Sequence, residues 1–390
     1  MFVKHLSLNN FRNYSTAEVE LAPGVNLLVG PNGQGKTNLV EAIGYLATLR
    51  SHRVAGYLPL IKNADPEIPG ATIRALVSHE SRDALIELEL NRDAQNRARI
   101  NKSPVNRVRD ILGYVNTVIF APEDLDIVKK DPSNRRDFID TLLVQVTPRF
   151  AGVFSDYERV LKQRNTLLRT ARQTGAKGTS LSTLDAWDES LIKFGSEIVA
   201  ARVALVERLR PLVLEAYQSI AIANNEPKIL VKSSLLGSLI PDGEEADDLE
   251  YIETANFDEV ANLYRAKLER VRSKELERGI TLVGPHRDDL VLLLSNLPAK
   301  GYASHGESWS YALALRLASI QLLKTETRSG DPILILDDVF AELDAGRRSR
   351  LAELVRNNEQ VLITAAVAED VPVELQAKVF NVRAGVIDVG

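Results

Sequence analysis

The residue types best suited to chemistry occur in segment 30–37, Gly-Pro-Asn-Gly-Gln-Gly-Lys-Thr. Glycines at this spacing let successive backbone N–H groups turn inward around phosphates, which is the pattern of an ATP-binding loop. All eight residues are therefore predicted to bind ATP: Gly30, Pro31, Asn32, Gly33, Gln34, Gly35, Lys36 and Thr37. In such a loop the Lys36 ammonium lies along the terminal phosphates and supports catalysis, and the Thr37 hydroxyl is a ligand of Mg²⁺.

A chance glycine-rich turn is the alternative to a phosphate loop, and the flanking sequence favours the loop. The preceding run Val25–Val29 is almost wholly apolar, as a buried strand is. After the loop, Leu39, Ile43 and Leu46 recur at helical spacing. A strand before the loop and an amphipathic helix after it are the context that ATP binding requires.

A second candidate group is the acidic pair Asp337-Asp338, which follows the apolar run 333–336. At the end of a buried strand, Asp337 can hold Mg²⁺ through water, and Asp338 can act as the base that orients or deprotonates the attacking water. Alone, the pair could equally be a turn in which Asp337 caps the next helix. Together with the upstream loop, it predicts an ATP-hydrolysing site.

A third candidate anion site lies before the helical stretch 311–324, where Ser304 and Gly306 stand at the expected helix start. The N-terminus of a helix attracts phosphate through its free backbone N–H groups and its dipole. A Ser-Gly helix cap without a ligand is the alternative, and for this motif taken alone it is the better interpretation.

The composition narrows the class of protein. The chain has 390 residues, 45% hydrophobic and 26% charged, so it can bury more than one core. It has no apolar run of about 18 residues and no signal-like start, so neither a membrane span nor a secretory signal is expected, and the cytoplasm is the predicted compartment. The absence of cysteine and five scattered histidines exclude common zinc sites. Any metal is therefore expected to arrive with a nucleotide.

The net charge of −5 does not by itself indicate a nucleic-acid binder, but two basic segments do. Segments 91–109 and 147–178 each carry a net charge of +5, whereas the acidic run 242–250 is predicted to be a solvated loop. The residues predicted to contact DNA are Arg97, Arg99, Lys102, Arg107, Arg159, Lys162, Arg164 and Arg169. The alternative is that each belongs to an ordinary solvated basic face.

Apolar residues recur at strand spacing in some segments and at helical spacing in others, and these segments are the elements that must position the candidate groups. Besides two strands in the first 21 residues, strand patterns occur at 25–29, 71–78, 84–90, 97–101, 115–120, 280–283, 289–294, 333–336 and 361–364. Helical patterns with few strand signals dominate between residues 121 and 278, at 134–146, 149–172, 184–222 and 257–277. The sequence thus predicts an α/β fold whose ATP site is divided by a helical insertion.

The order of loop, helical insertion, Ser-x-Gly helix start and acidic strand end resembles the ABC-type ATPase heads of the SMC group. Strings spread over almost the whole chain resemble the RecF family more narrowly: 8–14 (LNNFRNY), 51–53 (SHR), 121–125 (APEDL), 284–289 (GPHRDD) and 337–344 (DDVFAELD). The resemblance implies a P-loop NTPase of ABC/SMC head type with an inserted α-helical arm. The expected head is 1–120 and 279–390, and the expected arm is 121–278.

The resemblance also implies an ATP-dependent homodimer in which each nucleotide lies between two chains. The loop and Asp337-Asp338 of one chain would meet Ser304 and Gly306 of the other, with Asp344 along the seam. Arg12 would reach the phosphates from the amino-terminal strand. The implied role is ATP-dependent DNA binding in recombinational repair and replication, in which the protein helps RecO and RecR place RecA at gaps.

The chain departs from the family pattern at several positions. Glu307 follows the Ser-x-Gly start, and its carboxylate would repel phosphates unless it turns away. No histidine follows the strand 361–364, so Thr364 is the candidate for the phosphate-sensing position, and Pro122-Glu123 stands where a glutamine lid residue is usual. These departures leave the phosphate-sensing and metal-sensing positions open.

Asp338 is one methylene shorter than the Glu that transporter ATPases usually place there, so its reach to the attacking water is poor. We expect a DNA-dependent turnover well under the ~10 per second typical of enzymes, with ATP acting as a clamp on the dimer. Two alternatives remain at this point: an ABC-transporter-like ATPase subunit, and a DNA scaffold that binds ATP without hydrolysing it. The helical insertion and the missing histidine speak against the transporter subunit.

Overall fold

The computed structural model describes residues 1–62, 68–80, 82–174, 182–221, 225–236, 251–327, 330–375 and 377–389. The chain divides into two compact units, which we describe separately: the first comprises residues 1–126, 212–224 and 304–390, and the second 127–211 and 225–303. Among the described residues, no helix has the length and apolar character needed to cross a membrane. The acidic run 242–250 lies outside the described residues.

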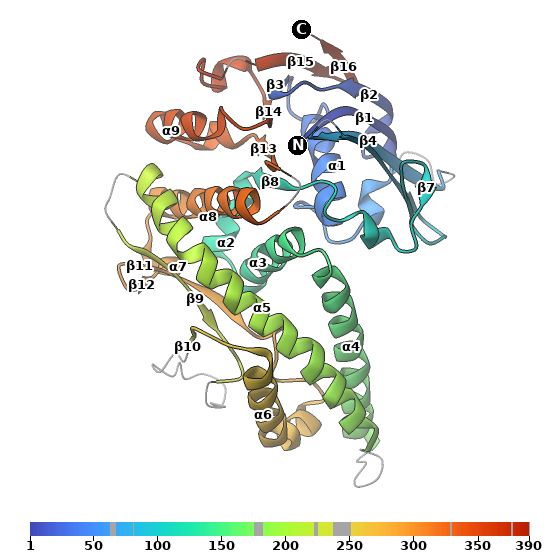
Figure 1. The fold of residues 1–390 in the computed structure, drawn as a ribbon, viewed down its shortest axis with the longest axis vertical. Helices are drawn as coiled ribbons and strands as arrows, with labels where there is room; N and C mark the ends of the chain where they lie inside the picture. The colour runs from blue at the N-terminus through green and yellow to red at the C-terminus, as the bar shows by residue number, and fades with distance from the viewer. Residues whose placement is uncertain are drawn as a thin grey trace. The chain divides into compact units, whose positions relative to one another are not determined.

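A six-stranded sheet is the centre of the first unit (Figure 1). Its strands, in spatial order, are β16 (Val386–Val389), β15 (Ala377–Arg383), β3 (Gly24–Val29), β14 (Gln360–Ala365), β13 (Ile333–Asp337) and β8 (Thr117–Phe120). All neighbouring pairs are parallel except β15 with β16. β13 is buried along its whole length, which explains its continuous apolar run. The carboxyl ends of β3, β13 and β14 meet at one edge, where the ATP site is expected.

An antiparallel sheet forms the other layer of the first unit. Its strands, in spatial order, are β2 (Tyr14–Glu20), β1 (Phe2–Phe11), β4 (Gly70–His79), β5 (Arg82–Asn91), β6 (Arg97–Ile100) and β7 (Ser103–Pro104). Helix α1 (Lys36–Thr48) contacts β4 of this sheet and β8, β13 and β14 of the parallel sheet. Its residues Leu39, Ile43 and Leu46 are fully buried in the shared core, as their helical spacing predicts. The first unit also contains helices α8 (His305–Glu326) and α9 (Ala345–Val355). The boundary between the two units falls within the short helix α2 (Leu125–Lys129), after Asp126.

The second unit combines long helices with a small sheet. Its helices are α3 (Pro132–Val146), α4 (Phe150–Thr174), α6 (Phe257–Arg278), α7 (Ala299–Tyr302) and the part of α5 (Ser182–Ile220) that ends at Pro211. Its sheet has the order β10 (Tyr251–Ile252), β9 (Pro227–Lys232), β11 (Asp289–Leu294) and β12 (Leu297–Pro298). α4 contacts α6, and α3 packs on β11.

One strand was not predicted, and one predicted strand is not formed. Residues 227–232, between the expected helices 184–222 and 257–277, form β9, which pairs with β11 along its whole length. Residues 280–283, expected to be a strand, have no strand partner because side chains bind their backbone: Asn165 Oδ1 accepts the Thr281 N–H at 2.7 Å, and Glu275 Oε1 accepts the Leu282 N–H at 2.8 Å.

By compactness, residues 212–224 belong to the first unit and residues 279–303 to the second. The expected functional division, a head of 1–120 with 279–390 and an arm of 121–278, stays a prediction.

Candidate nucleotide-binding site

The phosphate loop connects β3 to α1, and its backbone requires glycine. Gly35 precedes α1 with φ 115°, and a Cβ there would lie 2.7 Å from both Asn13 Nδ2 and Tyr14 Oη. At Gly30 a Cβ would lie 2.1 Å from the Val382 carbonyl oxygen. A side chain at either position would displace the loop from the strands that hold it.

Lys36 folds back into this loop. Its Nζ donates to the carbonyl oxygens of Gly30 at 2.7 Å and Pro31 at 3.2 Å, and the residue is buried. Outside the loop, Tyr14 Oη donates to the Gly35 carbonyl at 3.0 Å, and Asn13 Nδ2 donates to the Gln34 carbonyl at 3.1 Å. The loop is thus held in place around an ammonium group at the N-terminus of α1, where phosphate is favoured.

Thr37 and Asp337, separated by 300 positions in the sequence, are in direct contact. Thr37 Oγ1 donates to Asp337 Oδ1 at 2.9 Å, and Thr364 Oγ1 donates to the same oxygen at 2.6 Å. The register of β13 with β14 pairs Asp337 with Thr364. Burial alone would raise the pKa of Asp337, but His52 and the two threonine hydroxyls outweigh it and lower that pKa, so the carboxylate stays charged.

These oxygens suit Mg²⁺, which prefers hard oxygen ligands and usually keeps waters and phosphate oxygens in its shell. The described residues contain no group of three or more acidic or histidine side chains that could hold a metal by themselves. The Thr37 hydroxyl and the Asp337 carboxylate are two oxygen ligands of the kind that Mg²⁺ accepts beside waters and phosphate oxygens.

Asp338 begins the turn after β13 with φ 51°, and its backbone N–H donates to Thr364 Oγ1 at 3.0 Å. The residue is half-buried. Burial and the neighbouring Asp337 charge raise the pKa of Asp338, whereas Lys36 opposes the shift. A raised pKa makes a carboxylate a better proton acceptor, which agrees with the expected role as base.

The family-like strings 8–14 and 51–53 converge on a carboxylate that the sequence reasoning did not single out, Glu41 of α1. Its side chain is fully buried and receives Arg12 in a bidentate pair, Nε to Oε2 at 2.8 Å and Nη2 to Oε1 at 2.6 Å. Ser51 Oγ also donates to Glu41, and Arg53 Nη1 lies 3.6 Å from it. The spacing along the chain gives no signal for this cluster, because its members come from separate elements.

The Arg12 guanidinium therefore forms hydrogen bonds with groups of its own chain. Its remaining terminal nitrogen, Nη1, donates to the Pro59 carbonyl at 3.2 Å. The implied reach of Arg12 to the phosphates stays a prediction, and in this structure its guanidinium holds Glu41.

Ser304, Gly306 and Asp344 lie where two helices begin. Ser304 caps α8: its Oγ accepts from the Glu307 N–H at 3.2 Å, and Glu307 Oε2 accepts from the Ser304 N–H at 2.8 Å. The carboxylate of Glu307 is thus turned back to the helix start, where it accepts the Ser304 N–H, so the condition that it turn away from phosphates bound there is not met in this structure.

Asp344 caps α9 and is tied to the start of α8 by Arg347. The Arg347 backbone N–H, foremost, and its guanidinium lower the pKa of Asp344. Arg347 Nε donates to Ser310 Oγ at 3.0 Å, and a Cβ at Gly306 would lie 2.8 Å from Arg347 Nη2. Ser304, Gly306 and Asp344 thus share one region, and no hydrogen bond among the described residues joins them to the loop 30–37.

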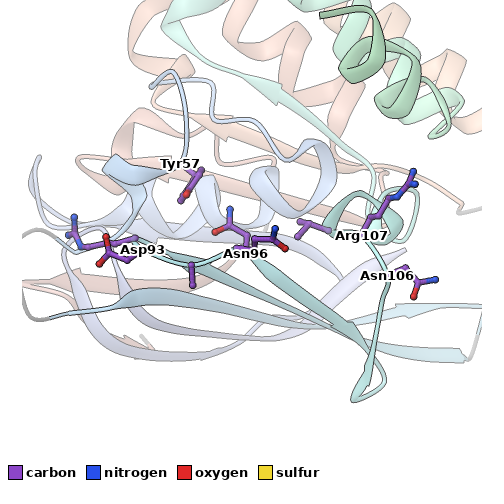
Figure 2. A pocket seen from close by; sticks show the side chains of 9 residues that line it. Tyr57, Asp93, Asn96, Asn106 and Arg107 are labelled. Atoms are coloured by element: carbon purple, nitrogen blue, oxygen red, sulfur yellow. The ribbon is translucent and has the colours of Figure 1, made fainter. Parts of the chain in front are cut away.

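The candidate DNA contacts of the first unit differ in availability. Arg97 and Lys102 are exposed, whereas Arg99 pairs with Glu89 at 2.6 Å. Arg107 is exposed and lines an open pocket of about 700 Å³. Figure 2 shows Arg107 at one end of this pocket and Tyr57 nearer the other. The pocket adjoins β6. Of the four predicted cations in this unit, Arg97, Lys102 and Arg107 are exposed candidates for contact with DNA phosphates, whereas Arg99 is paired.

In the second unit, Lys162 and Arg169 are exposed on α4, and Arg159 pairs with Asp156 at 2.9 Å. Arg164 is different because its side chain is fully buried. Its guanidinium donates to Asp188 at 2.6 Å and to Glu275 at 2.7 Å. The prediction that Arg164 contacts DNA is therefore wrong, since its charge is neutralised inside the unit.

Sequence comparisons show which known proteins this chain is similar to. The family model described as the RecF/RecN/SMC N terminal domain matches residues 2–387. The DNA replication and repair protein RecF of Clavibacter michiganensis subsp. michiganensis is 53% identical over 99% of this chain and 96% of its own length. The RecF of Streptomyces avermitilis is 52% identical over the full length of both.

The fold of this chain is also similar to that of solved structures. A recombination mediator protein RecF with ATPrS, from the RecFOR pathway, has a TM-score of 0.86 at 28% identity, covering 100% of this chain and 98% of that one. An Smc head domain from Pyrococcus furiosus has a TM-score of 0.51 at 15% identity, covering 100% of this chain and 96% of that chain, and shows the fold alone. The α/β P-loop fold of ABC/SMC head type is thus confirmed, and the transporter-subunit alternative is not favoured.

Proposed function

Because the chain belongs to the RecF family of DNA replication and repair proteins, we propose that it is an ATP-controlled DNA-binding protein that hydrolyses ATP slowly. The observation that carries the proposal is the contact of Thr37 with Asp337 at 2.9 Å, because it joins the two distant halves of a phosphate-and-metal site. We further propose that the protein acts in the cytoplasm.

The loop N–H groups and Lys36 bind the phosphates, and the loop does not have to rearrange because it is already held by Tyr14 and Asn13. Thr37 and Asp337 would hold Mg²⁺, which when bound neutralises developing charge on the phosphate oxygens. Asp338 accepts the proton of the attacking water, helped by its raised pKa. Its short side chain keeps turnover slow, and DNA stimulates it.

Within one chain this site is half complete. We propose that ATP closes a homodimer in which Ser304, Gly306 and Asp344 of a second copy face the loop. The location of these three residues at the starts of α8 and α9 supports this, because helix N-termini favour anions.

For DNA, we propose contacts from two separate sets of exposed cations, Arg97, Lys102 and Arg107 in the first unit and Lys162 and Arg169 in the second. The paired Arg99 and Arg159 add less charge. Single-stranded, double-stranded and gapped DNA are all candidate forms. RecO and RecR are the proposed protein partners, with loading of RecA at gaps as the outcome.

The test compares wild type with Lys36→Ala and Asp338→Asn for ATP binding, dimerisation, hydrolysis and retention on DNA. We expect Lys36→Ala to lose ATP binding and dimerisation together, because it removes the ammonium inside the loop. Asp338→Asn should bind ATP and remain dimeric on DNA while hydrolysis falls by about 10²–10⁴-fold. Hydrolysis by Asp338→Asn at the wild-type rate would refute the base assignment. No hydrolysis by wild type would favour a non-hydrolysing scaffold.

A further inference from the structure

His52, in the family-like string 51–53, has so far been described only as a neighbour that lowers the pKa of Asp337. Its side chain is only 15% exposed, and its Nε2 lies 3.6 Å from Asp337 Oδ2, slightly beyond hydrogen-bond distance. Among the described residues, that buried nitrogen has no hydrogen-bond partner. A buried polar atom without a partner is costly, so the position indicates a contact that is completed in another state of the site.

The neighbours of His52 fix its position. Ser51 Oγ donates to Glu41 and accepts the backbone N–H groups of Arg53 at 3.0 Å and Val54 at 3.2 Å. Arg53 Nη1 donates to Asn38 Oδ1 at 2.8 Å. Since Glu41 and Asn38 both belong to α1, the helix that follows the phosphate loop, the segment is anchored beside the nucleotide site on both sides of His52.

The two oxygens of Asp337 have different surroundings. Oδ1 accepts both the Thr37 and Thr364 hydroxyls, whereas Oδ2 faces His52. A carboxylate that holds a metal directly or through water works best in one orientation, and a hydrogen bond to its other oxygen is the usual means of fixing it.

We propose that His52 is a positioning residue for Asp337. With nucleotide and Mg²⁺ bound, Nε2–H donates to Oδ2 and fixes the carboxylate in the orientation that serves the metal. This inference rests on the proposed ATP function, and it adds a residue whose effect depends on the metal and not on the phosphates.

The experiment measures the affinity of the full-length chain for ATP in Mg²⁺ and in EDTA, for wild type, His52→Ala and His52→Gln. We expect His52→Ala to weaken binding roughly 10- to 100-fold in Mg²⁺ and to leave binding in EDTA unchanged. His52→Gln, whose amide can donate, should recover part of the loss. His5→Ala is the matched control, because His5 belongs to the same unit and is 41% exposed beside Glu18.

A second readout follows the metal itself. Electron paramagnetic resonance of Mn²⁺ bound with ATP should show weaker retention of the metal in His52→Ala than in wild type or His5→Ala, while the unfolding temperature without ligand stays within the range of the control. Equal losses in Mg²⁺ and EDTA would overturn the proposal, as would unchanged affinity in both. If wild type itself fails to bind ATP, the proposed function fails and not only the role of His52.

Discussion

Removing the Arg12 side chain tests whether this residue is a clamp within the chain or a contact to phosphate. In the structure, Arg12→Ala leaves the fully buried Glu41 carboxylate without its bidentate partner. Loss of one member of a buried ion pair typically costs 3–5 kcal/mol. Ser51 and Arg53 still face Glu41, so we take the lower end, about 3 kcal/mol. For a unit of 150–250 residues, that corresponds to a fall in Tm of about 6–12 °C.

The assay is thermal unfolding of wild type, Arg12→Ala, and the double variant Arg12→Leu with Glu41→Leu. Replacing both charges with apolar side chains removes the unpaired carboxylate, so the double variant should regain most of the lost stability. It should also bind ATP as wild type does, if Arg12 acts only through Glu41. A single variant that unfolds at the wild-type temperature would refute the energetic argument. A stable double variant with ATP affinity reduced tenfold or more would show that Arg12 contacts the nucleotide.

Three further outcomes follow from the structure. Asp338 must be deprotonated to accept a proton, and its pKa is raised. ATP turnover measured against pH should therefore fall as the pH is lowered, with a midpoint above the ordinary carboxyl value of 3.8. A midpoint at or below 3.8 would contradict the assignment of Asp338 as the base. Arg164→Ala should destabilise the second unit by about 3 kcal/mol in chemical unfolding, because the fully buried Glu275 carboxylate loses its ion-pair partner while Asp188 keeps Arg272; a change near zero would contradict the buried ion pair. Replacing Arg97, Lys102 and Arg107 with alanine should flatten the slope of log affinity for double-stranded DNA against log salt by about 2.7, and an unchanged slope would mean that these three residues do not contact DNA phosphates.

The sequence predicted the parts of the site that depend on local pattern. The loop 30–37 and the acidic end of β13 were predicted because a glycine-rich turn, an apolar strand and adjacent carboxylates are each visible within ten residues. The Thr37–Asp337 contact then confirms that these parts meet. The proximity of Thr364 to Asp337 follows from the register of two parallel strands.

The parts that depend on distant neighbours could not be predicted in the same way. The strand β9 places Ile229 and Val231 on its buried face, but its partner β11 follows about sixty positions later, and pairing at that distance leaves no local signal. Glu41 was missed because its partners come from a strand turn and a loop. Arg164 did carry a usable signal, since it is four positions from both Val160 and Leu168, which are buried on the same face of α4.

The place of β3 in its sheet has a consequence for a chain that is still being synthesised. β3, which carries the phosphate loop, leaves the ribosome among the first strands, yet both of its neighbours, β14 and β15, lie within residues 360–383. A nascent chain that ends before residue 360 therefore carries the loop without the strands that flank it and without the Val382 carbonyl against which Gly30 packs. We therefore expect the nascent chain to become able to bind ATP only after β14 and β15 have been synthesised.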